Sequence, residues 1–290
     1  MTLSDLIINI WLKFRFWFIR NFTPWKLVYE SPEQKNGRVL TFKDDFDIIS
    51  WSGTGKDMKW KYGEGWGQFH PDNPHQYYCE PKLERGYSMA KFFVDYHPHT
   101  FPDDFRTGQP ITINHRNSLL SSQPSFSQQY GRFECRCTIP FFRGSWPAFW
   151  LWTQTRDQDE TPLYTEIDIF ELYGRENGKK AGKQEINLHY HINDDWQHLK
   201  SWGVKIQNDP NQLRFHEFVL EWTPSKIEVF TDGQKIFRYT RKDVLDTFYN
   251  NPGQKMWIII NNGLDKKYVS ADDETYESEF FVDYIRAYKY

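Results

Sequence analysis

The chain has 290 residues, with 36 basic and 39 acidic side chains and a formal net charge of −3. Neither sign of charge forms a long block, which excludes the usual electrostatic pattern of a nucleic-acid-binding protein. Aromatic residues make up 19% of the sequence, more than a minimal core requires, so some of these rings are expected to line a binding surface.

Residues 1–28 form an apolar and aromatic segment that Lys13, Arg15 and Arg20 interrupt. The segment matches neither a secretory signal nor a membrane span. Its apolar residues recur at a helical period, at Leu3, Ile7, Ile10, Phe14 and Trp17. This pattern predicts a short amphipathic helix that packs on the domain or on a partner, with attachment to a membrane surface as the alternative.

From residue 29 onward, short apolar or alternating runs are separated by Gly, Pro, Asn and Asp, which is typical of an all-β protein. The clearest predicted strands are 131–139, 148–153, 165–172, 185–191, 215–222, 226–231, 255–261 and 280–288. A second helical stretch is predicted at 241–248, and the predicted rim loops are 53–80, 156–162 and 174–183. The tripeptides 223–225 and 231–233 predict tight turns, so we expect residues 29–290 to form one domain of two antiparallel sheets.

Three acids crowd the predicted strand 165–172. In a pleated strand Glu166 and Asp168 point to one face, whereas Ile167 points into the core. Glu171 lies an odd number of positions from Glu166, so a regular strand sends it to the opposite face. One extra residue in a β-bulge returns it to the acidic face, and bulges are frequent beside active sites.

Like charges on one strand face repel each other, which suggests a functional reason for the crowding. Retaining glycosidases use two carboxyl groups about 5–5.5 Å apart, one as nucleophile and one as general acid and then base. Glu166 and Glu171 suit this chemistry, with Asp168 between them. An exposed edge strand with a solvated acidic face is the alternative that the hexapeptide alone leaves open.

Several motifs in order along the chain resemble those of glycoside hydrolase family 16. They are the bulged Glu-x-Asp-x-x-Glu strand, YGRFECRCTIPFFRGSWPAFWLW at 130–152, FHEFVLEWTPSKIEVFTDGQKIF at 215–237 and FFVDYIRAYKY at 280–290, with LTFKDDFD at 40–47 as an opening strand. The resemblance covers residues 40–290 and implies a concanavalin A-like β-jelly-roll sandwich.

The resemblance also implies roles for the three acids. Glu166 corresponds to the nucleophile, Asp168 to its partner and Glu171 to the acid/base, in a double displacement that retains the anomeric configuration. The implied substrate is a β-linked polysaccharide, either a β-1,3-glucan or a marine galactan, and no cofactor is needed for the chemistry. Basic loop residues such as Lys179 are either contacts for sulfated sugars or ordinary solvated charges.

Other residues are expected to contact the sugar. Trp146 and Trp150 lie in the segment that resembles the family's WPAFW motif, and His189 resembles its histidine near the scissile bond. Asn261 and the loop residue Trp66 are further candidate contacts, although core packing, turn capping or loop anchoring would also explain these residue types.

Asp283 matches the position at which many members of the family hold a structural calcium. One carboxylate without a partner at recognisable spacing is also compatible with an ordinary solvated Asp. A calcium site at Asp283 is therefore an expectation from the resemblance alone.

Two other activities fit the same residues. A transglycosylase uses the same acids but transfers the sugar to another sugar, and a non-catalytic carbohydrate-binding sandwich shares the fold. A polysaccharide substrate would lie outside cells, yet the sequence shows no recognisable signal peptide, so the export route stays open.

Overall fold

The computed structural model describes residues 34–35, 37–51, 58–63, 68–69, 75–84, 87–102, 107–140, 142–156, 162–174, 183–192, 195–205 and 214–290. The predicted helical segment 1–28 lies outside the described residues, so its boundary with the domain stays a prediction. Trp66 also lies outside them.

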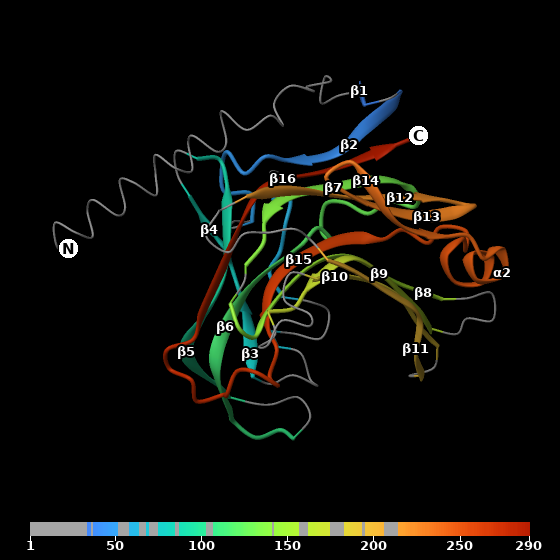
Figure 1. Ribbon diagram of the computed structural model, residues 1–290. Coiled ribbons are helices and arrows are strands. Elements are labelled where there is room, and N and C mark those ends of the chain that lie inside the picture. Colours follow the sequence, from blue (N-terminus) through green and yellow to red (C-terminus); the bar gives the residue numbers. More distant parts are fainter. Residues whose placement is uncertain are drawn as a thin grey trace.

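The described chain is built almost entirely of β-strands (Figure 1). The strands are β1 Gln34–Lys35, β2 Arg38–Asp44, β3 Gln76–Cys79, β4 Lys82–Leu83, β5 Ala90–Phe101, β6 Ile111–Ser121, β7 Gly131–Thr138, β8 Ser145–Arg156, β9 Pro162–Leu172, β10 Lys183–Ile192, β11 Asp195–Lys205, β12 Phe215–Thr223, β13 Lys226–Thr231, β14 Gln234–Tyr239, β15 Trp257–Leu264 and β16 Glu277–Lys289. One helical turn, α2 Lys242–Val244, continues as a π-helical turn over Leu245–Tyr249.

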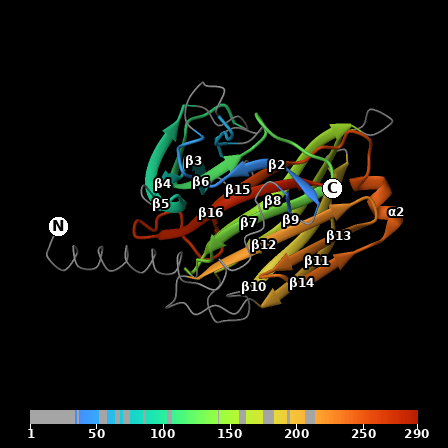
Figure 2. The ribbon, with the colours of Figure 1, turned by 90° about the horizontal axis from the view of Figure 1, so that it is seen from above.

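The strands form two curved layers that continue into one another (Figure 1), and seen from above the strands of one layer overlap those of the other (Figure 2). One layer has the order β11-β10-β9-β8-β15-β6, and the other runs β5-β16-β7-β12-β13-β14. Strand β6 joins them, because residues 111–117 pair with β5 whereas Leu119–Ser121 pair with β15. The pairing is antiparallel except between β3 and β6. This arrangement is the predicted two-sheet sandwich.

Alternating apolar residues build the core between the layers. In β7, the side chains of Phe133, Cys135 and Cys137 are fully buried, and in β9 Ile167 and Ile169 are as well. All five belong to one large hydrophobic cluster between the two sheets. Because the inward faces are filled by apolar side chains, the polar residues of β9 and its neighbours are directed to the open face of their layer.

The strands predicted from residue patterns are confirmed, with ends that move by at most a few residues. The turn at 231–233 is confirmed as a hairpin turn between β13 and β14, in which Asp232 and Gly233 have positive φ angles of 51° and 76°. The helical stretch predicted at 241–248 is also present. Strand β3 was expected to be loop, and it is stabilised by parallel pairing with β6, a contact that its four residues do not reveal.

Candidate active site

A β-bulge in β9 places the three acids on one face of the sheet. Opposite β8, Asp168 pairs with Trp150 and Glu171 pairs with Ala148, so the two residues of β9 between these pairs face a single residue of β8, Phe149. The extra residue makes Ile169 and Phe170 consecutive core residues, both fully buried. The predicted bulge is therefore present.

Strand β10 presents polar side chains to the same acids. Its cross-strand pairs with β9 are Glu185 with Glu171, Asn187 with Asp168 and His189 with Glu166. His189 Nε2 lies 3.3 Å from Asp168 Oδ2. The structure thus brings His189 to the acid trio, as expected.

The carboxyl group of Glu171 accepts hydrogen bonds from three side chains. Trp146 Nε1 donates to Oε1 at 2.7 Å, and the Tyr173 hydroxyl donates to the same oxygen at 3.0 Å. Asn187 Nδ2 donates to Oε2. The rings of Trp146 and Tyr173 stack, with centroids 5.4 Å apart, so Trp146 lies directly beside the trio.

A buried tyrosine fixes the backbone beneath the acids. The hydroxyl of Tyr249, from the helical turn, donates to the carbonyl oxygen of His189 at 2.9 Å and lies 3.3 Å from that of Glu166. These carbonyls belong to paired residues of β10 and β9. Tyr249 therefore ties the two site strands together from the core side.

Burial and mutual repulsion raise the pKa values of both glutamates. For Glu171 the pKa rises to about 8, mainly because burial disfavours the charge and also because Asp168 is close, while the Trp146 and Tyr173 hydrogen bonds oppose the rise. The pKa of Glu166 is also raised, first by burial and then by the charge of Asp168 and a hydrogen bond with it. The group therefore holds protons at neutral pH, as acid–base chemistry requires.

Comparison with known proteins decides the family. The model of the glycosyl hydrolases family 16 matches residues 89–285, which include the acid trio and all strands around it. The chain belongs to glycosyl hydrolases family 16. Family 16 is a retaining family whose chemistry needs no cofactor, and this member is an endo-acting glycanase for β-linked polysaccharides.

Individual relatives agree with this membership. The chain is 26% identical over 266 residues to a β-glucanase of Rhodothermus marinus, covering 87% of this chain and 85% of that protein. It is 25% identical to an endo-1,3-1,4-β-glycanase of Rhizobium meliloti, of which it spans about half the length (51%). The κ-carrageenase of Pseudoalteromonas carrageenovora has the same fold, with a TM-score of 0.64 at 19% identity over 90% of this chain and 99% of that one.

Two of the expected sugar contacts, Trp150 and Asn261, lie on the acid face of the sheet. The side chain of Trp150 is half-buried, and its Nε1 donates to Oδ1 of Asn261 on β15 at 2.9 Å. Asn261 therefore orients the Trp150 ring as well as facing the site. A direct contact of either residue with sugar stays a prediction.

The family 16 calcium position shows a different contact. Asp283 on β16 accepts a hydrogen bond from Nη1 of Arg136 on the neighbouring strand β7, and both strands belong to the layer that does not contain β9. In the described part of the chain, one group of acids and histidines is close enough to hold a metal, and it is Glu166, Asp168 and His189 of the active site. The residues at Asp283 thus do not fit a calcium cage, since the guanidinium already neutralises this carboxylate.

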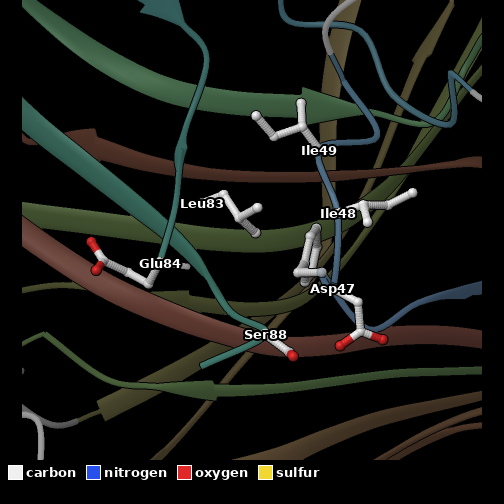
Figure 3. A pocket seen from close by; sticks show the side chains of 7 residues that line it. Asp47, Ile48, Ile49, Leu83, Glu84 and Ser88 are labelled. Atoms are coloured by element: carbon white, nitrogen blue, oxygen red, sulfur yellow. The ribbon is translucent and has the colours of Figure 1, made fainter. Parts of the chain in front are cut away.

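A surface pocket of about 370 Å³ lies elsewhere, between the segment after β2 and strand β4 (Figure 3). Ile48 and Ile49 face Leu83 across it, with Asp47 and Glu84 at its sides. None of the acid trio lines this pocket.

The described helices include none that is long and apolar enough to cross a membrane.

Sequence patterns missed three residues that touch the site. Two of them could have been predicted, because alternate residues of a strand share a face. This rule places Tyr173 on the face of Glu171 and Glu185 on the face of Asn187. Tyr249 gave no signal, since its contact joins residues that are 60 and 83 positions away.

Proposed function

We propose that this chain is a retaining endo-hydrolase of β-1,3-linked glucan, with Glu166 as nucleophile and Glu171 as acid/base. The bulge at Ile169 is the observation that supports these roles, because it puts both glutamates on one face with Asp168 between them. Their surroundings also differ. Glu171 is held by Trp146, Tyr173 and Asn187, whereas Glu166 shares a hydrogen bond with Asp168.

The reaction proceeds by two displacements. Glu166 attacks the anomeric carbon while protonated Glu171 gives its proton to the leaving oxygen. Glu166 must be a carboxylate for this attack, so its proton passes to Asp168, the side chain that forms a hydrogen bond with it. Glu171, now ionised, then takes a proton from water, which attacks the glycosyl ester and releases the sugar with retained configuration.

Two considerations support a neutral glucan as substrate. A β-glucanase of Rhodothermus marinus is similar to this chain over 87% of this chain and 85% of its own length. In addition, no salt bridge joins the three acids to a Lys or Arg in the described part of the chain. Lys183, the nearby cation of β10, has its Nζ 3.7 Å from Oε1 of Glu185. A sulfated galactan would bring further negative charge to a face that already carries four acidic side chains, so it is the less suitable substrate.

The roles are tested by comparing isosteric variants. Glu166→Gln and Glu171→Gln should each lower turnover of the polysaccharide by at least about a thousandfold. Melting temperatures and circular dichroism should show that both variants fold. A folded Glu166→Gln variant that keeps substantial activity would remove the assignment of the nucleophile.

The substrate is tested with a panel of purified polysaccharides, with reducing ends as the readout. Laminarin should be cut, and agar, porphyran and carrageenan should not. Product lengths separate hydrolysis from transfer, because only shortened products are expected from a hydrolase whereas new, longer oligosaccharides would indicate a transglycosylase. Binding without any cleavage would favour the non-catalytic alternative.

A further inference from the structure

The two oxygens of the Glu171 carboxyl group have different surroundings. Oε1 accepts from both Trp146 Nε1 at 2.7 Å and the Tyr173 hydroxyl at 3.0 Å, whereas Oε2 accepts from Asn187 alone. A carboxylate oxygen has about two lone-pair sites, so the two donors fill Oε1. The site for a proton is therefore the remaining lone pair of Oε2.

The position of Tyr173 keeps the surroundings of the two Glu171 oxygens different. Its ring stacks on Trp146 at 5.4 Å with an interplanar angle of 25°, and it lies on the same strand face as Glu171 because Leu172 between them is buried in the core. Each ring thus limits the rotation of the other. The pair holds two donors on one oxygen without help from the substrate.

The acidic groups near Glu171 act in the opposite direction to these donors. Strand β9 contributes Asp168 and Glu166, and β10 contributes Glu185 with its neighbour Lys183, and His189. Strand β8 faces Glu171 with Ala148 and Trp146, which carry no charge. The acids favour protonation of Glu171, whereas the Tyr173 and Trp146 hydrogen bonds favour its ionised form.

We infer that Tyr173 is a positioning residue that, together with Trp146, holds Oε1 of Glu171 and directs the catalytic proton to Oε2. The inference rests on the proposed role of Glu171 as acid/base. In the first displacement, the O–H bond at Oε2 breaks as the leaving oxygen takes the proton. In the second, Oε2 accepts a proton from the attacking water, and Oε1 keeps its two hydrogen bonds throughout.

The Tyr173→Phe variant tests this inference, because it removes the hydroxyl and keeps the ring. Loss of a donor to the ionised form raises the pKa of Glu171, so the basic limb of the kcat/KM–pH profile should move up by roughly one pH unit. Tyr164→Phe is the matched control, since Tyr164 also lies on β9 and stacks on a β8 tryptophan, Trp152, at 5.9 Å. Its profile should keep the wild-type limb.

A second variant and a second substrate make the test independent of folding. Trp146→Phe removes the other donor and should also move the basic limb upward. In both variants, turnover of the polysaccharide should fall at least tenfold more than turnover of an aryl β-glycoside whose leaving group needs no proton. A basic limb that stays at the wild-type pH in both folded variants would overturn the inference.

The Glu171→Gln variant separates this inference from the proposed function. It should lose activity on the polysaccharide, and azide, which attacks without a general base, should restore turnover of the aryl glycoside. If Glu171→Gln instead cuts the polysaccharide normally, both assignments fail. If it behaves as expected while Tyr173→Phe leaves the basic limb in place, only the role of Tyr173 is refuted.

Discussion

Glu171 combines burial with negative neighbours, an arrangement that suits an acid catalyst and works against stability. Its pKa is raised to about 8, first by desolvation and then by the charge of Asp168. Ionising such a group costs more free energy in the folded state than in the unfolded chain. The residue that carries the acid chemistry is therefore expected to destabilise the fold at high pH.

The sign of this effect gives a prediction. Because the folded pKa lies above the unfolded value, the folded chain binds more protons between about pH 4.5 and 8, and its stability falls as the pH rises through this window. Glu171→Gln removes the effect. The variant should match the wild type near pH 4.5 and exceed it near pH 8, by an amount on the order of a few kcal/mol.

Chemical denaturation of both proteins at a series of pH values measures the difference. Glu277→Gln is a suitable control, because this residue is exposed at the start of β16 and should give no such pH-dependent gain. A Glu171→Gln variant that is less stable than the wild type at pH 8 would contradict the raised pKa.

At the scale of elements, the bulge in β9 depends on a buried glutamine. Gln184 on β10 is fully buried, its Nε2 donates to the carbonyl of Ile169 at 2.8 Å, and its Oε1 accepts from the Thr231 hydroxyl at 2.7 Å. Thr231 belongs to β13 of the other layer. Gln184 thus satisfies the bulge carbonyl and links it to the opposite sheet across the core.

Replacing Gln184 with Leu should destabilise the protein by about 2–3 kcal/mol, because it leaves the buried Ile169 carbonyl and Thr231 hydroxyl unsatisfied. Activity in the folded fraction should also fall, since the bulge is what directs Glu171 to the acid face. Denaturant unfolding and turnover per folded molecule measure the two effects.

Thr231→Val provides the comparison for Gln184→Leu. It removes one end of the link and leaves the Ile169 carbonyl bonded, so it should lower stability with little change in turnover. Equal loss of turnover in both variants would show that the side-chain amide of Gln184 does not act on the site through the bulge.

The sequence predicted the elements of the site because its signals there are local. Alternation in 165–172 and the odd spacing of Glu171 together required the bulge, and the flanking strands followed from the same period of two. Gln184 and Tyr249 were not predictable in this way. Each acts through a contact across the core or between strands far apart in the chain, and a polar residue in an apolar run gives no indication of its partner.

At the scale of the whole molecule, the two layers carry different kinds of charged group. The β9 layer carries the acids, and the β16 layer carries buried ion pairs, among them Arg136 with Asp283 and Arg132 with Glu134. The family resemblance predicted calcium at Asp283, and the structure shows an arginine at that carboxylate instead. The calcium expectation came from the position alone, which does not reveal what charge lies beside it.

A chelator tests this difference. With Arg136 as the counter-charge of Asp283, EDTA should leave the melting temperature unchanged, and added calcium should not raise it. Arg136→Gln should destabilise the protein by a few kcal/mol, because it removes the positive charge that lies beside a nearly buried carboxylate. A melting temperature that falls in EDTA and recovers with calcium would restore the calcium site.

The pairing of Glu166 and Glu171 on one face is tested most directly by trapping the glycosyl-enzyme. In Glu171→Gln, an aryl β-glycoside can still react with the nucleophile, but water attack lacks its base, so the ester should accumulate. Mass spectrometry of the digested protein should then find one glycosyl group on Glu166. A glycosyl group on another residue, or turnover of the aryl glycoside with no ester at Glu166, would contradict the proposed mechanism.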